Sequence, residues 1–295
     1  MDKDPWPKTL YHTSNPHLMK GYVQLLRARN CLMAVVSVLI VALIAVELDW
    51  AEIPVFPVLI ACAVVFLFMG GGNSLNDYLD RDIDRRVHRK RPIPRGLVKP
   101  KSALAFSAGL FAASVVLSLW LHYYAIIIVL VNLAIMLTYE FKAKGSGLAG
   151  NLMISWLTGS IFLFGAMVLH ADHPDLLDLV LILLLLSFFA TLGREITKDI
   201  QDVRGDVGRT TLPMKVGRRK AGYAAMACFA LAIILSPLPY ILGIFGWLYL
   251  IIVIAADAIF IYAAVSLKKS PRRASGGAKT AMLAALAAFL LGGLI

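Results

Sequence analysis

Charged residues are scarce in this chain of 295 residues. Asp, Glu, Lys and Arg make up 16% of it, against about 25% in a soluble globular domain, while 59% of the residues are hydrophobic. This balance excludes an ordinary soluble protein. The apolar residues form runs of about 18 to 25, the length that crosses a bilayer as a helix. The composition therefore predicts an all-α, polytopic membrane protein.

Cysteine is also rare. Cys31, Cys62 and Cys228 each lie inside an apolar run, and their spacing fits neither a disulfide framework nor a metal site. The N-terminal stretch has no short apolar core followed by a small-residue cleavage site, so no secretory signal peptide is predicted. We expect the three thiols to act as small hydrophobic side chains.

Nine apolar runs are long enough to span the membrane. They cover roughly residues 30–47, 54–76, 103–120, 122–140, 148–169, 177–197, 220–239, 244–267 and 277–295. Residues 1–24 are predicted to form a polar N-terminal extension, and residues 25–295 a single membrane domain. Across the boundary between these two parts, residues 18–29 mix apolar and basic side chains, which predicts a short interfacial helix.

Lys and Arg are absent from every second loop. All 29 of them fall in the N-terminal segment, in the even-numbered loops or at the span ends that lead into these loops. Because basic residues collect on the cytoplasmic side, the pattern predicts a cell-membrane protein with a cytoplasmic N-terminus and an external C-terminus. It also explains the net charge of +11 without nucleic acid, through topology, contact with anionic membrane lipid and an anionic substrate.

An acidic stretch ends the second span. Asn76, Asp80 and Asp84 follow one another at i, i+4 and i+8, so a helix places them on one edge with Asp77 beside them, while Asp82 points elsewhere. A solvated loop with scattered charge is the alternative. Carboxylates at this spacing repel one another unless a cation holds them together, and such oxygen ligands suit Mg²⁺ bound jointly with a substrate phosphate.

A second acidic cluster follows the sixth span. Asp199, Asp202 and Asp206 lie at offsets 0, 3 and 7, which again form one helical stripe on the predicted cytoplasmic side. Two such clusters predict a diphosphate clamped by Mg²⁺ and stabilised as a leaving group. The predicted catalytic residues are Asp80, Asp84, Asp199 and Asp202.

Basic residues near these clusters are candidates for binding phosphate. Guanidinium groups match the geometry of phosphate oxygens, although positive-inside charge alone also explains their presence. The predicted diphosphate- or substrate-binding residues are Asn76, Arg27, Arg29, Arg89, Arg91, Tyr139, Lys142, Lys144 and Lys198.

The two acidic stretches resemble the motifs of the UbiA superfamily of intramembrane prenyltransferases. Asn76 to Asp84 reads Asn-Asp-x-x-Asp-x-x-x-Asp, and Asp199 to Asp206 reads Asp-x-x-Asp-x-x-x-Asp. Within the superfamily, Arg194 to Asp202, Thr211 to Pro213 and Arg91 to Pro94 are similar to archaeal digeranylgeranylglyceryl phosphate synthases. The resemblance covers nearly the whole chain, and it implies nine helices in a ring around a central cavity.

The resemblance also implies a reaction. A geranylgeranyl group would pass from geranylgeranyl diphosphate to the sn-2 hydroxyl of geranylgeranylglyceryl phosphate, forming an ether in archaeal membrane lipid biosynthesis. The proton acceptor is open between a carboxylate and the released diphosphate. The metal ligands would be Asn76, Asp77, Asp80, Asp84, Asp199, Asp202 and Asp206.

Two other functions compete with this one. An aromatic prenyltransferase of the same superfamily, which makes a quinone or tetrapyrrole precursor, would use identical metal chemistry with a different acceptor. An ion or phosphate transporter is disfavoured, because transport sites lie near the membrane midplane and these clusters lie at span ends. Prenyl chain length and oligomeric state are left open.

Overall fold

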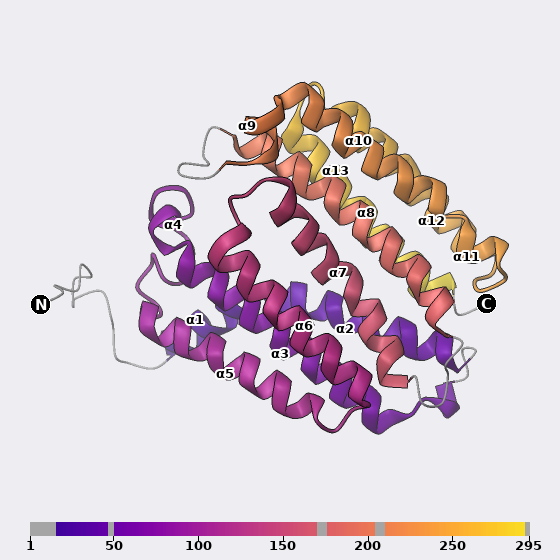
Figure 1. Cartoon of the computed structure of the whole chain (residues 1–295), viewed down its shortest axis with the longest axis horizontal. Coiled ribbons are helices and arrows are strands. Elements are labelled where there is room, and N and C mark those ends of the chain that lie inside the picture. The colour runs from indigo at the N-terminus through magenta and orange to yellow at the C-terminus, as the bar shows by residue number, and fades with distance from the viewer. Residues whose placement is uncertain (1–15, 47–49, 170–175, 204–209, 293–295) are drawn as a thin grey trace, which may run out of the picture. The chain divides into compact units, whose positions relative to one another are not determined.

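The computed structural model describes residues 16–46, 50–169, 176–203 and 210–292 (Figure 1). Every regular element in these ranges is helical. Nine of the described helical segments are long and apolar enough to cross a membrane, which confirms the predicted number. Their bounds are Ala28–Ala45, Val55–Leu79, Pro100–Ser118, Tyr123–Ala143, Leu148–Leu169, Leu176–Asp202, Arg218–Ile241, Trp247–Ser266 and Pro271–Gly292.

These spans correspond to the helices labelled in Figure 1. They are α2, α3, α5, α6 (Tyr123–Thr138) with the π-helical turn η3 (Tyr139–Ala143), α7, α8, α10 (Arg218–Leu235) with α11 (Leu238–Ile241), α12 and α13. The shorter elements are α1 (Pro16–Leu26), the 3₁₀ turn η2 (Trp50–Glu52), α4 (Arg81–Val87) and α9 (Leu212–Val216). The helix α1 overlaps the short helix predicted over residues 18–29, its interfacial position stays a prediction, and most of the polar extension lies outside the described residues.

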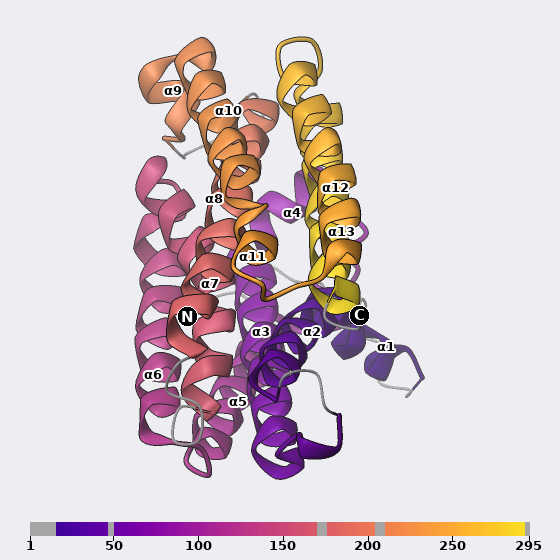
Figure 2. The ribbon, with the colours of Figure 1, turned by 90° about the vertical axis from the view of Figure 1, so that its right-hand side faces the viewer.

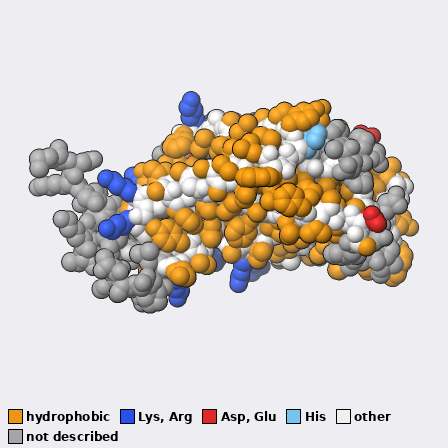
Figure 3. Space-filling view, turned by 90° about the horizontal axis from the view of Figure 1, so that it is seen from below, with side chains coloured by type: hydrophobic (Ala, Val, Ile, Leu, Met, Phe, Trp, Pro, Cys, Tyr) orange, Lys and Arg blue, Asp and Glu red, His pale blue; other side chains and the backbone are white. Residues whose placement is uncertain are grey.

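Hydrophobic side chains remain exposed along the spans. Val265 is 71% exposed and Ile234 is 68% exposed, and hydrophobic side chains dominate the face drawn in Figure 3. A soluble protein rarely exposes such continuous apolar surface. Lipid tails are the medium that such a surface requires, so the chain is a multi-pass membrane protein.

The chain divides into two compact units. Unit 1 comprises Met1–Val35 and Cys62–Leu119, and unit 2 comprises Val36–Ala61 and Trp120–Ile295. The first acidic stretch belongs to unit 1 and the second to unit 2. The proposed boundary between an extension (residues 1–24) and one membrane domain (residues 25–295) stays a prediction.

In unit 1, small residues let α5 lie close to α3. Ser107 Oγ donates to the carbonyl of Gly71 at 2.8 Å, and Ser114 Oγ donates to the carbonyl of Val64 at 3.0 Å. A Cβ on Gly71 would lie 3.1 Å from the ring of Phe111. Helices in lipid associate through such close packing and hydrogen bonds, so these contacts fix the α3 end that carries the acidic stretch.

The loop between α4 and α5 is anchored in the core of unit 1. Ile93 and Val98 from this loop are buried with Leu25 of α1 and Ala103 of α5. The loop closes on itself through a hydrogen bond of 3.0 Å from the Leu97 N–H to the Pro92 carbonyl. A loop held in this way presents its basic side chains from a fixed backbone.

In unit 2, α8 packs against α10 and α13, and α12 runs alongside α13 (Figures 1 and 2). Alanine and glycine dominate these interfaces. A Cβ on Gly193 of α8 would lie 2.6 Å from the ring of Phe229, and Ala225 of α10 is fully buried. This packing holds the C-terminal end of α8, where the second acidic cluster begins.

Candidate active site

The first acidic stretch lies at the junction of α3 and α4. The Asp80 N–H donates to the Asn76 carbonyl at 2.9 Å, and the Asp84 N–H donates to the Asp80 carbonyl at 2.8 Å. The predicted i to i+4 relation therefore holds, although the helix is interrupted at Asp80, whose φ is −83° and ψ 2°. The side chain of Asp80 does not cap α4. Asp82 is 70% exposed, away from the buried carboxylates.

Two arginines bind the carboxylates of this stretch. Arg27 Nη2 donates to Asp77 Oδ1 and, at 3.4 Å, to Asn76 Oδ1. Arg91 Nη1 lies 3.1 Å from Asp77 Oδ1 and 2.7 Å from Asp84 Oδ2. The Asp77 and Asp84 side chains are 3% and 2% exposed, so each would be costly to bury without a cation. The spacing of the carboxylates predicted a cation among them, and Arg27 and Arg91 supply part of this positive charge.

The pKa of Asp84 depends on its burial and on the charges around it. Burial raises the pKa of Asp84 above its ordinary value, and the charge of Arg91 opposes this shift. The negative charges of Asp77 and Asp80 raise the pKa further. Burial is the main cause of the shift, and a cation added near Asp77 and Asp80 would oppose the part that their charges contribute.

Asn73 fixes the position of Arg27, a role that the sequence reasoning missed. Asn73 Nδ2 donates to the Leu26 carbonyl at 2.9 Å and so satisfies an acceptor left open at the end of α1. Arg27 follows in the left-handed region with φ 51°, which a residue other than glycine rarely adopts. A Cβ on Gly70 would lie 2.6 Å from Leu26 Cδ2, so a larger residue here would require the Leu26 side chain to move.

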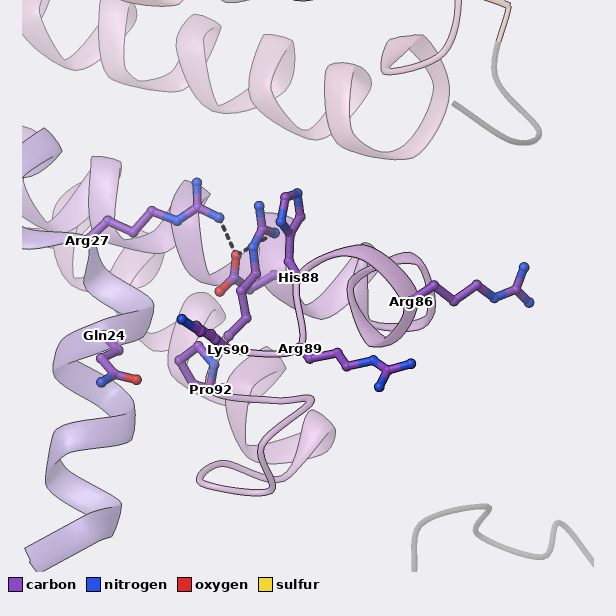
Figure 4. A pocket seen from close by; sticks show the side chains of 9 residues that line it. Gln24, Arg27, Arg86, His88, Arg89, Lys90 and Pro92 are labelled. Atoms are coloured by element: carbon purple, nitrogen blue, oxygen red, sulfur yellow. Dashed lines mark hydrogen bonds and ion pairs between the residues drawn. The ribbon is translucent and has the colours of Figure 1, made fainter. Parts of the chain in front are cut away.

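A pocket of about 560 Å³ opens beside these arginines (Figure 4). It is lined by Gln24, Arg27, Asp77, Arg86, His88, Arg89, Lys90, Arg91 and Pro92. Arg89 and Arg91 were predicted to bind phosphate, and both line this pocket. Arg29 does not; it is exposed near the start of α2.

The second acidic cluster begins on the last turns of α8 in unit 2. Asn151 Nδ2 of α7 donates to Asp199 Oδ2 at 2.8 Å, which orients this carboxylate. Lys198 Nζ is bound to Glu195 Oε2 at 2.7 Å, and Arg194 Nη1 to Glu195 Oε1 at 2.8 Å. Asp202 is exposed. Asp206, the last member of the predicted cluster, lies outside the described residues.

Tyr139 and Lys142 lie on η3, between α6 and α7, and Lys144 follows this turn directly. Lys144 Nζ forms an ion pair with Glu140 Oε2 at 2.7 Å, and the Lys144 N–H donates to the Tyr139 carbonyl at 2.8 Å across the π-helical turn. Such turns are frequent at functional sites. Lys142 is exposed. Sequence spacing did not indicate Glu140 or the widened turn.

Gly150→Ala is expected to lower the free energy of unfolding by about 1–3 kcal/mol, as overpacked sites do. An ideal Cβ on Gly150 would lie 2.5 Å from the Ala143 carbonyl oxygen of η3, a contact that requires the backbone to move. Thermal unfolding of the purified protein in detergent measures the change. Gly276→Ala is the matched control, because nothing lies within 4 Å of its Cβ and alanine is the better helix former. Equal melting temperatures for the two variants would contradict the proposed contact.

The oxygen ligands at the α3–α4 junction fit Mg²⁺. Mg²⁺ is usually held by one or two carboxylates together with substrate phosphates, rather than by a closed protein cage. Within the described ranges, no three His, Cys, Asp or Glu side chains converge as a metal site. Asn76, Asp80 and Asp84 are the oxygen donors that could hold the ion with a substrate phosphate, and the negative charges of Asp77 and Asp80, which add to the raised pKa of Asp84, favour a cation there.

Comparison with known proteins identifies the family of this chain. The UbiA prenyltransferase family matches residues 33–291. The chain is 39% identical over 276 residues to the digeranylgeranylglyceryl phosphate synthase of Natronomonas pharaonis, covering 93% of this chain and 97% of that one. A solved structure of a digeranylgeranylglyceryl phosphate synthase has a TM-score of 0.75 at 39% identity and covers 94% of this chain and 99% of its own.

A more distant structure shares the fold alone. It is a UbiA homologue from Archaeoglobus fulgidus bound to DMAPP and Mg²⁺, with a TM-score of 0.68, 15% identity, and coverage of 93% of this chain and 99% of that one. The family match spans most of the chain, and the full-length relative exceeds a third identity. The chain therefore belongs to the UbiA prenyltransferase family and is a multi-pass membrane enzyme that transfers prenyl groups.

Proposed function

We propose that this enzyme transfers a geranylgeranyl group from geranylgeranyl diphosphate to the sn-2 hydroxyl of geranylgeranylglyceryl phosphate. The allylic C–O bond to the diphosphate breaks, the ether C–O bond to the glycerol forms, and the diphosphate and the hydroxyl proton leave. The product belongs to archaeal membrane lipid biosynthesis. The observation that carries the proposal is the near full-length identity to digeranylgeranylglyceryl phosphate synthases.

The two acidic motifs carry the diphosphate chemistry in this proposal. Asn76, Asp80 and Asp84 would hold Mg²⁺ at the first motif, with Asp77 beside them, and Asp199, Asp202 and Asp206 at the second. When bound, the metal supplies charge that stabilises the departing diphosphate. Support comes from the UbiA homologue bound to DMAPP and Mg²⁺.

The chain's own groups prepare this site. Arg91 holds Asp77 and Asp84 in place, and Asn151 orients Asp199. Preorganised charge of this kind stabilises a transition state without reorganisation during the reaction. Two other predicted substrate ligands, Lys144 and Lys198, are held by ion pairs with glutamates. They would therefore reach a phosphate from fixed positions.

The orientation in the membrane is part of the proposal. The distribution of Lys and Arg favours a cytoplasmic N-terminus, cytoplasmic acidic motifs and an external C-terminus. The ring of helices around a central cavity, which the family resemblance implies, also stays a prediction. Cysteine labelling from either side of sealed vesicles, at Lys101 and at Glu52, tests the orientation.

A panel of acceptors tests the function. The purified enzyme is given radiolabelled geranylgeranyl diphosphate and Mg²⁺ with geranylgeranylglyceryl phosphate, with a hydroxybenzoate, or with no acceptor. We expect an ether product from the glyceryl phosphate alone. Product from the hydroxybenzoate alone would replace the proposal with aromatic prenylation.

A further inference from the structure

The pocket in unit 1 is strongly basic. Five of its lining side chains, Arg27, Arg86, Arg89, Lys90 and Arg91, are cationic, and a single carboxylate, Asp77, faces them. Cations therefore outnumber carboxylates in the lining, even though Asp84, which lies outside it, neutralises part of the charge through its ion pair with Arg91. Such concentrated charge of one sign attracts a ligand of the opposite sign.

The cations in this pocket fall into two groups. Arg27 and Arg91 are bound to Asp77 and Asp84. Within the described part of the chain, Arg86, Arg89 and Lys90 form no ion pair, and all three are exposed. Figure 4 shows that Arg86 and Arg89 extend to the same side, although they come from α4 and from the loop that follows it. Two guanidiniums that extend to the same side suit a phosphate group.

The backbone beneath these cations is preformed. Pro92 and Ile93, next to Lys90 and Arg91 in the chain, are buried, and the Arg91 N–H donates to the His88 carbonyl at 3.0 Å. The Arg95 N–H donates to the Arg91 carbonyl at 3.1 Å. A ligand would bind without ordering this loop, which lowers the cost of binding.

The two substrates of the proposed reaction make different demands. The donor diphosphate can share Mg²⁺ with the carboxylates of the acidic motifs. A phosphate monoester that has no metal of its own is repelled by those carboxylates and requires cations directly. The volume of about 560 Å³ exceeds what a phosphate alone needs and lies within the usual range for small-molecule sites, so a phosphorylated glycerol fits.

We infer that this basic pocket binds the phosphate monoester of the acceptor lipid through Arg86 and Arg89, which extend to the same side, whereas Lys90 points to the other side (Figure 4). The inference rests on the proposed function, because it names the subsite of that acceptor. Arg27 and Arg91 form the shared wall between the pocket and the first acidic motif, since both line the pocket and both bind Asp77. The reacting hydroxyl is on the glycerol carbon next to the phosphorylated one, so this adjacency brings it toward the motif.

Kinetics with two acceptors test the inference. Arg86→Ala, Arg89→Ala and the Arg86→Ala/Arg89→Ala pair are assayed with geranylgeranylglyceryl phosphate and with geranylgeranylglycerol, which lacks the phosphate. Each substitution should raise KM for the phosphorylated acceptor about tenfold, the effect of losing one hydrogen bond to a charged group. The preference of wild type for the phosphorylated acceptor, as a ratio of kcat/KM, should shrink by the same factor. Inorganic phosphate should compete with this acceptor in wild type and compete less in the pair.

The control is Arg272→Ala/Arg273→Ala, a pair of neighbouring exposed cations at the start of α13. It should leave both KM values unchanged. An increase in KM for the donor, or an equal loss with both acceptors, would overturn the inference. So would an effect that appears in vesicles of anionic lipid and vanishes in neutral detergent, because it would assign the cations to the membrane surface. Failure of wild type to use either acceptor would instead refute the proposed function.

Discussion

Alanine at Asp80 or at Asp202 is expected to lower kcat for prenyl transfer by about 10²–10³-fold, the cost of losing one group that stabilises charge in a transition state. Both residues belong to the proposed Mg²⁺–diphosphate motifs, and neither is buried. Their loss should therefore leave the folded protein intact while it removes a metal ligand. The Mg²⁺ concentration required for half-maximal activity should rise in both variants, which a change in folding alone would not produce.

Two aspartates provide matched controls. Asp82 lies on α4 two residues after Asp80, is 70% exposed, and contacts Arg81 at a distance of 3.9 Å. Asp178 is exposed in the first turn of α8, the helix that carries Asp202 near its other end. Asp82→Ala and Asp178→Ala should retain turnover close to wild type. If Asp80→Ala and Asp202→Ala also retained near wild-type, Mg²⁺-dependent turnover, the metal assignment would be wrong.

The membrane architecture was predictable because it depends on composition over long windows. Each described span matches a predicted apolar run, and only the ends differ. The sixth run, for example, was predicted to end at residue 197, yet α8 continues to Asp202. A hydropathy pattern does not predict this extension, because most of the added residues are polar. The helix continues because Ile196 and Ile200 are buried against α10 and α9.

The acidic motifs were also predictable, since their spacing is written in the sequence. Their partners were less so. Arg91 was predicted as a phosphate ligand because guanidinium groups near the acidic clusters match phosphate oxygens, and the structure adds its ion pairs with Asp77 and Asp84. That contact depends on how the α4–α5 loop folds back onto α3, which no local pattern encodes.

The backbone conformation of Arg27 is a second feature that no local sequence pattern predicts. Its left-handed backbone arises because Asn73 binds the Leu26 carbonyl and Gly70 admits α1 to the surface of α3. These residues are more than 40 positions away from Arg27 in the chain. Asn73 and Gly70 were visible in the sequence, but their effect on Arg27 follows only from tertiary packing.

Arg91→Ala is expected to destabilise the protein by about 3–5 kcal/mol, the cost of leaving a buried charge without its partner. Asp84 is 2% exposed and loses the guanidinium that lies 2.7 Å away, whereas Asp77 keeps its bond to Arg27. Thermal unfolding in detergent measures the loss. Asp82→Ala breaks a solvent-exposed contact and should change stability by less than about 1 kcal/mol.

The double variant Arg91→Ala/Asp84→Asn separates stability from activity. Asparagine removes the unpaired charge, so the double variant should regain part of the stability lost by Arg91→Ala, with a coupling of about 0.5–3 kcal/mol. Its activity should not return, because Asp84 is proposed to hold Mg²⁺.

Acid provides a second test of the same pair. Burial already raises the pKa of Asp84, and removal of Arg91 takes away the charge that opposed this shift. A carboxyl whose pKa is higher in the folded state than in the unfolded state favours folding as the pH falls, because the folded protein binds the extra proton. The stability deficit of Arg91→Ala should therefore shrink on acidification through the raised pKa, while Asp82→Ala shows no such trend. A deficit that stays constant with pH, or a double variant no more stable than Arg91→Ala, would show that Arg91 does not stabilise the fold through Asp84.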